Sequence, residues 1–211
     1  MPLLPIPDLM RRARAQGCAV GYFESWNLES LQGVIDAAEE TRSPVIIGFN
    51  GEFLTRPERR ASERIAWYGA LGRAAAESAS VPCGFIFNEC PLDAPVREAV
   101  DAGFNLVMPV PAHAEAHDAY AARVRAIVAF AHGRGVAVEA ELGELPFGPA
   151  GQVGGSATDP QAAAAFVAAT GIDLLAVSVG NVHILLDGQQ ALDLSALEAI
   201  HRAADVALVL H

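Results

Sequence analysis

Four apolar runs in the sequence each end in a side chain that can bind a metal ion. The runs are GFIFNE, VAVEAE, LLAVSVGNVH and VALVLH, and their last residues are Glu89, Glu141, His183 and His211. Packing alone gives a buried strand no reason to end on a carboxylate or an imidazole, because such groups are costly to bury without a partner. The carboxyl ends of parallel strands meet at one edge of a sheet. We therefore expect these four side chains to converge on one metal site.

Helical stretches separate the apolar runs, and this alternation predicts a parallel sheet that is covered by helices. The runs are continuous in Val, Ile, Leu and Phe, as is typical of parallel strands that are buried on both faces. The predicted strands lie at residues 19–23, 44–49, 81–87, 106–110, 136–142, 174–180 and 206–211.

Seven strands in this rhythm predict an α/β fold of the (β/α)8 TIM-barrel type, with its reactive residues at the carboxyl ends of the strands. Such a barrel needs about 250 residues, whereas this chain has 211 and ends on the seventh predicted strand. We interpret residues 1–211 as a single barrel domain whose last helix, eighth strand and following loop are missing from the sequence. An open, doubly wound sheet is the alternative.

Several helix starts can be placed from local signals. A short helix is predicted within residues 1–17, and another follows Asn27 with apolar residues at helical spacing. Pro91 suits the first position of a helix, and Asp159 before Pro160 is typical of a helix cap. His113 and His117 are four residues apart after the fourth strand and are predicted to share one helix face.

Composition narrows the function classes. A net charge of −11 argues against nucleic acid and anionic membranes as partners. No apolar stretch is long enough to span a bilayer, and the three cysteines have no regular spacing, which favours a reducing compartment such as the cytoplasm. All 14 basic residues are arginines, so a lysine Schiff base is excluded for this sequence. Carbon–carbon bond cleavage would then need another electron sink, for example a divalent cation.

The sequence resembles the class II, metal-dependent fructose-bisphosphate aldolases and their tagatose-bisphosphate relatives. The resemblance covers nearly the whole chain and is most specific in VEAELG and in the Asn27-Leu28-Glu29 start of the first helix after a strand. It implies a zinc ion or another divalent cation with His183 and His211 among its ligands. It also implies that Glu139 and Glu141 lie near the metal, and that the substrate is a sugar or sugar phosphate.

Some positions depart from the family pattern. Glu89 stands where the family has a histidine ligand, and Asn88 stands where it has the proton-transferring aspartate. Glu24 replaces an asparagine, and Asn50 falls in the family's serine region. The family's lysine near the phosphate is absent from residues 184–187. In the long loop at 143–159, Glu144 is the carboxylate that could take over proton transfer.

We therefore predict a divergent aldolase-like lyase that acts on a ketose or ketose phosphate. The predicted metal ligands are Glu89, His183, His211 and Glu141. The acid/base candidates are Glu24, Glu144 and Glu141, with Asn88 in the catalytic position, and the predicted substrate contacts are Asn27, Asn50 and Gly180. We expect a cytoplasmic homodimer or homotetramer without nucleic-acid or membrane partners. A non-catalytic aldolase-fold protein and a metal-dependent sugar isomerase or epimerase are the alternatives.

Overall fold

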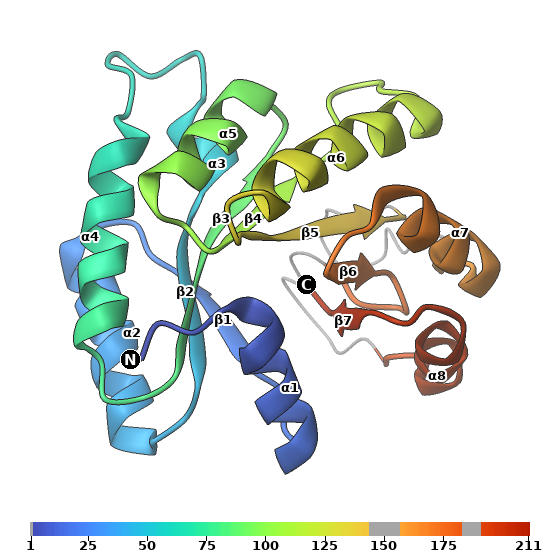
Figure 1. The fold of residues 1–211 in the computed structure, drawn as a ribbon, viewed down its shortest axis with the longest axis horizontal. Coiled ribbons are helices and arrows are strands. Elements are labelled where there is room, and N and C mark those ends of the chain that lie inside the picture. The colour runs from blue at the N-terminus through green and yellow to red at the C-terminus, as the bar shows by residue number, and fades with distance from the viewer. Residues whose placement is uncertain (1, 144–156, 183–190) are drawn as a thin grey trace. The chain divides into compact units, whose positions relative to one another are not determined.

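A computed structural model describes residues 2–143, 157–182 and 191–211 of the chain (Figure 1). Within these ranges, seven strands pair in parallel, each with its neighbour in the sequence. They are β1 (Gly21–Glu24), β2 (Val45–Asn50), β3 (Cys83–Cys90), β4 (Leu106–Pro109), β5 (Ala137–Leu142), β6 (Leu174–Val177) and β7 (Ala207–Val209). The predicted α/β class and the parallel pairing are confirmed. Closure into a (β/α)8 barrel stays a prediction.

Helices connect the strands, as the alternating pattern predicts. They are α1 (Ile6–Gln16), α2 (Leu28–Thr41), α3 (Gly51–Leu54), α4 (Ile65–Ser78), α5 (Asp93–Ala102), α6 (His117–His132), α7 (Pro160–Thr170) and α8 (Leu194–Ala203). Asn27 caps α2 through a capping box with Ser30, and Asp159 caps α7 ahead of Pro160. No helix in the described ranges is long and apolar enough to cross a membrane.

Two of the predicted helix positions are wrong. Helix α5 begins at Asp93 rather than at Pro91, because Leu92 still has extended backbone angles. Helix α6 begins at His117, and His113 lies in a turn before it, next to Ala114 with its positive φ of 58°. His113 and His117 therefore do not share a helix face.

The chain divides into two compact units. The first comprises Met1–Ala116 and Ala126–Val138, and the second comprises His117–Arg125 and Glu139–His211. Strand β5 belongs to both units: Ala137 and Val138 pair with β4, and Glu139–Leu142 pair with β6.

One face of the sheet in the first unit packs on helices α2, α4 and α5. Phe49 and Phe85 occupy this face: the ring of Phe49 lies 5.0 Å from that of Tyr68 on α4, and Phe85 packs beside Gly72 of the same helix. A side chain at Gly72 would collide with the Phe85 ring, so the glycine lets α4 approach β3 closely.

The opposite face of β1–β3 is covered at its amino-terminal end by α1 (Figure 1). Side chains alternate along a strand, so Gly84 points away from the face of Phe85. The space beside Gly84 is filled by Ile6 and Leu9 of α1 and by Ile46 of β2. Helix α1 therefore covers the start of this face, and the residues at the carboxyl ends of the strands lie beyond it.

Candidate active site

In the first unit, three neighbouring strands carry polar side chains at their carboxyl ends, on the face of the sheet that α1 covers. Glu24 is paired in register with Gly48, and Asn50 is paired with Asn88. Because side chains repeat every two residues along a strand, Glu24, Asn50 and Asn88 all lie on this one face. Asn50 and Asn88 are only 6% and 4% exposed. Three neighbouring strands thus place polar side chains at their carboxyl ends on one face, and the predicted convergence of Glu89, Glu141, His183 and His211 stays a prediction.

Asn50 links two carboxylates to the start of helix α3. Its Nδ2 donates a hydrogen bond to Glu89 Oε2 at 2.8 Å, and it is also hydrogen-bonded to Glu24. Its Oδ1 accepts a hydrogen bond from the backbone N–H of Phe53 at 3.1 Å, as the N-cap of α3. Because both its Nδ2 and its Oδ1 are hydrogen-bonded, the Asn50 amide is fixed and holds Glu24 and Glu89 in position.

The environment of Glu24 favours its protonated form. Burial raises the pKa of the Glu24 carboxyl, and the negative charge of Glu89 raises it further, while hydrogen bonds from Asn50 and Tyr22 act in the opposite direction. Tyr22, two residues earlier on the same face, donates its hydroxyl to Glu24 Oε2 at 3.4 Å. Tyr22 was not predicted as a site residue, although its spacing from Glu24 places both residues on one side of the strand.

The raised pKa of Glu24 predicts a pH dependence of stability. A carboxyl whose pKa is higher in the folded chain binds its proton more tightly there, so this stabilisation is complete below the unfolded pKa and is lost as the pH rises through the folded pKa. In metal-free protein, the free energy of unfolding of the parent should therefore fall relative to that of Glu24→Gln as the pH rises through this window. Urea unfolding at a series of pH values measures the difference. A constant difference would contradict the raised pKa.

Glu89 lies in an irregular part of β3, not after its end as the sequence predicts. The strand continues to Cys90, and its register with β4 shifts between Phe87 and Cys90. Glu89 has a φ of 49°, in the left-handed region that non-glycine residues avoid. A bulge of this kind turns a side chain in a new direction. It brings the Glu89 carboxylate to Asn50.

Glycine usually makes a folded chain less stable than alanine does, but the left-handed backbone at Glu89 predicts the opposite order at this position. Glu89→Gly and Glu89→Ala both remove the carboxylate, but only alanine retains the left-handed penalty. We expect the glycine variant to be more stable than the alanine variant by about 1 kcal/mol, after allowing for the extra chain entropy of glycine. Glu40, exposed in α2, is the control position, where glycine should be the less stable replacement. Urea unfolding measures the stability of the four variants. The same order of stability for glycine and alanine at both positions would contradict the prediction.

Asn88 carries a buried oxygen that has no hydrogen-bond partner. Its Oδ1 and the hydroxyl of Ser25 are the buried side-chain atoms in this condition within the described part of the chain. Buried polar atoms are nearly always hydrogen-bonded, so an unpaired acceptor at the end of a strand indicates a position for a ligand hydroxyl or a water molecule.

The second unit contains a buried pair of a histidine and a carboxylate. His211 Nε2 lies 3.1 Å from Glu139 Oε1, and the two side chains are 12% and 4% exposed. An ionised carboxylate only accepts hydrogen bonds, so a neutral His211 beside ionised Glu139 carries its proton on Nε2 and its lone pair on Nδ1. Histidines that bind metals are commonly held by a carboxylate in this way.

The remaining predicted residues have varied surroundings. Glu141 lies in β5, where its backbone N–H approaches the Tyr120 hydroxyl at 3.3 Å. Asn27 is the N-cap of α2, and Gly180 has a φ of 97°, which strains any other residue. Glu144 and His183 lie outside the described residues.

The carboxylate of Glu89 and the imidazole of His211 are groups of the type that bind divalent cations. Asn50 orients the Glu89 carboxylate, and Glu139 orients the His211 imidazole; both are outer partners of the type that metal ligands have. Within residues 2–143, 157–182 and 191–211, no three histidine, cysteine, aspartate or glutamate side chains form a group that could hold a metal. The predicted ligand set also includes His183, which lies outside these ranges.

Parallel α/β folds with carboxylates and amides at their strand ends occur in many unrelated proteins, and comparison with known proteins identifies the family of this chain. The sequence model of the class-II fructose-bisphosphate aldolase family matches residues 5–211. The chain belongs to this family, which confirms the resemblance noted in the sequence.

Individual relatives agree with this assignment. The chain is 34% identical over 218 residues to the probable fructose-bisphosphate aldolase of Bacillus subtilis (strain 168), with 100% of this chain and 73% of the relative covered. It is 31% identical over 224 residues to the fructose-bisphosphate aldolase of Staphylococcus aureus (strain Mu50 / ATCC 700699), with the same coverage. The crystal structure of the YdjI aldolase from Escherichia coli K12 is similar with a TM-score of 0.84 and 32% identity, over 99% of this chain and 72% of that chain.

Proposed function

We propose that the protein is a metal-dependent lyase that catalyses the reversible aldol cleavage of a ketose or ketose phosphate. The observation that carries the proposal is the meeting of Glu24, Asn50, Asn88 and Glu89 at three strand ends in a member of the class II aldolase family. We also propose that the parallel sheet belongs to a (β/α)8 barrel.

The proposed cofactor is zinc or another divalent cation. Glu89, His183 and His211 would hold it, with Glu141 at an alternative position. When bound, the cation supplies the positive charge that polarises the substrate carbonyl. Asn50 and Glu139 keep the Glu89 and His211 side chains oriented for this task.

Glu24 is the acid/base that the described residues support best. Glu24 shares its face with Asn88 and is hydrogen-bonded to Asn50, which also binds Glu89, whereas Glu144 lies outside the described residues and Glu141 is proposed above as an alternative metal ligand. Glu24 accepts the proton from the hydroxyl on the carbon that becomes the aldehyde. The adjacent carbon–carbon bond breaks, its electron pair stays on the carbon next to the ketone, and Glu24 returns the proton to that carbon. The Asn88 carbonyl accepts a hydrogen bond from a substrate hydroxyl and so orients the chain.

Metal analysis combined with a cleavage assay tests the proposal. Elemental analysis of the purified full-length protein should find about one zinc or similar ion per chain, and the Glu89→Ala, His183→Ala double variant should lose it. The loaded protein should release an aldehyde from a panel of ketoses and ketose phosphates. Isomerised sugar without an aldehyde would favour the isomerase or epimerase alternative. A protein that takes up no metal under any loading condition would favour a non-catalytic role.

Glu139 offers a second test of the metal site. Glu139→Gln keeps the size of the side chain behind His211 but removes its charge, so we expect zinc affinity to fall by about 10- to 100-fold. Competition with a chromogenic chelator measures the affinity. Glu198→Gln, at an exposed ion pair with Arg202, is the control and should leave it unchanged. Equal zinc affinities in the two variants would mean that the charge of Glu139 does not support metal binding by His211.

The state of the cysteines bears on the cellular compartment. The three cysteines are all free, which is consistent with a reducing compartment. We propose a cytoplasmic enzyme of carbohydrate metabolism that works as a homodimer or homotetramer.

A further inference from the structure

Asn181 is a buried asparagine of the second unit, just after the end of β6, and it is 7% exposed. Its Oδ1 accepts a hydrogen bond from the backbone N–H of Val179 at 2.8 Å. Its Nδ2 donates to the backbone carbonyls of Val177 and His211, each at 3.2 Å. Of the neutral side chains, only the amides of asparagine and glutamine combine two N–H donors with an acceptor. The three contacts therefore use what is particular to an amide.

The hydrogen bond from Asn181 to His211 joins two segments beyond the point where their strands pair. The last pair in the register of β6 and β7 is Ala176 with Val209. His211 comes two residues after Val209, and Asn181 comes after the end of β6. The Asn181 side chain thus takes the place of a ladder hydrogen bond and fixes the backbone of His211 against the segment that continues β6.

The turn that carries Asn181 is tightly held. Gly180 has a left-handed φ of 97°, and a Cβ at this position would lie 2.8 Å from the carbonyl oxygen of Ala191. Thr158 binds both backbone groups of Ser178: its hydroxyl accepts from the N–H at 2.9 Å, and its own N–H donates to the carbonyl at 2.8 Å. The Asn181 amide therefore projects from a rigid support, as the precise placement of another group requires.

His211 is consequently held at two points. Its Nε2 lies 3.1 Å from Glu139 Oε1, and its backbone carbonyl is bound to Asn181. The direction of the Nδ1 lone pair depends on the position of the backbone and on the rotation of the ring. Asn181 fixes the first and Glu139 fixes the second, so the two contacts together define where a cation could bind.

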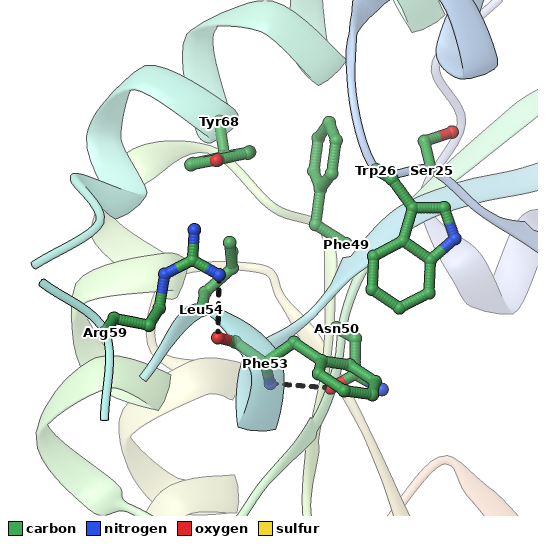
Figure 2. A pocket seen from close by; sticks show the side chains of 8 residues that line it. All are labelled: Ser25, Trp26, Phe49, Asn50, Phe53, Leu54, Arg59 and Tyr68. Carbon is green, nitrogen blue, oxygen red and sulfur yellow. Dashed lines mark hydrogen bonds between the residues drawn. The ribbon is translucent and has the colours of Figure 1, made fainter. Parts of the chain in front are cut away.

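An asparagine with similar contacts occurs in the candidate site of the first unit. Asn50 Oδ1 accepts a hydrogen bond from the backbone N–H of Phe53 (Figure 2), and its Nδ2 donates to Glu89 at 2.8 Å. In both asparagines, the carbonyl of the amide is anchored on backbone and the NH₂ group holds a residue of the proposed ligand set. The sequence does not reveal this use of Asn181, because its partner His211 is 30 residues away.

We propose that Asn181 is a positioning residue for the metal site. It fixes the backbone of His211 so that, with Glu139 beside the imidazole, the Nδ1 lone pair points in one direction. The inference rests on the proposed function, in which His211 is a metal ligand. It adds to that function a residue that acts through the ligand and touches neither the metal nor the substrate.

The zinc affinity of full-length Asn181→Leu, measured by competition with a chromogenic chelator, tests the proposal. Leucine is similar in size but has no polar group, so His211 loses its backbone support and we expect the affinity to fall about tenfold. Asn105→Leu is the matched control. Asn105 likewise accepts from a backbone N–H, that of Phe85, and donates to a backbone carbonyl, that of Leu4, but it precedes β4 at the amino-terminal end of the sheet. Both variants should lower the melting temperature, and only Asn181→Leu should weaken zinc binding.

A double variant separates positioning from a general loss of stability. Glu139→Gln acts on the same imidazole, and once one support is lost the other no longer fixes the lone pair. Asn181→Leu with Glu139→Gln should therefore lose less zinc affinity than the product of the two single losses. If Asn181→Leu does not fold, Asn181→Gln, which keeps the amide but displaces it by one methylene, gives the same comparison.

The outcomes separate the inference from the proposed lyase. An unchanged affinity in Asn181→Leu, or losses that simply multiply in the double variant, would overturn the positioning role even if the parent binds zinc and cleaves ketoses. A tenfold loss in a protein that binds zinc but cleaves nothing would uphold the positioning role and reject the lyase. A parent that takes up no zinc would overturn both.

Discussion

Replacement of Glu24 by glutamine is expected to lower the kcat for ketose cleavage by about 10²- to 10⁴-fold, the usual contribution of a general acid/base. Glutamine keeps the size of the side chain and its contact with Asn50, but it cannot accept the hydroxyl proton. Burial and the Glu89 charge hold the pKa of Glu24 above its ordinary value. That shift makes its carboxylate a stronger base than an exposed glutamate. KM should change little, because the proton moves only during the reaction.

The Glu24 experiment requires two controls. Glu29→Gln, exposed at the start of α2, should retain the parent kcat, and the zinc content of Glu24→Gln should match that of the parent. Asn88→Asp in the Glu24→Gln background restores a carboxylate to the same face of the sheet and should recover part of the lost activity. An unchanged kcat in Glu24→Gln would assign the proton transfer to another residue. A loss of bound zinc would instead give Glu24 a role in the metal site.

The regular elements were predictable because their signals are local. Continuous apolar runs placed the strands to within a few residues, and Asn27 and Asp159 marked helix starts by side-chain hydrogen bonds that the sequence itself specifies. Pro91 was misplaced because proline is compatible with both an extended segment and a first helical turn. Only the tertiary structure decides between the two.

The geometry of the candidate site was less predictable. The sequence identified Glu24, Asn50, Asn88 and Glu89 individually, but not the left-handed backbone of Glu89 or its bond to Asn50. A bulge depends on how two strands pair, and residue types alone seldom encode it.

Phe85→Ala is expected to lower the free energy of unfolding by about 3–5 kcal/mol, the range for large aromatic side chains that leave a cavity. Phe85 is fully buried and stacks on Phe104 with ring centroids 4.0 Å apart. Gly72 on α4 brings helix backbone close to the ring, so the surrounding structure cannot easily collapse into the space. Phe85 lies in β3, the strand that also carries Asn88 and Glu89. Loss of packing beneath β3 should therefore also weaken metal binding.

Phe23→Ala provides the matched control for Phe85. Phe23 is in β1, but it is 57% exposed, and we expect its removal to change the free energy of unfolding by no more than about 0.5 kcal/mol. Urea unfolding followed by circular dichroism compares the two variants. Similar losses in both variants would contradict the argument that burial and the cavity determine the effect of Phe85→Ala. A loss restricted to Phe85→Ala would show that the buried packing of Phe85, against Phe104, Phe49 and Gly72, stabilises the first unit.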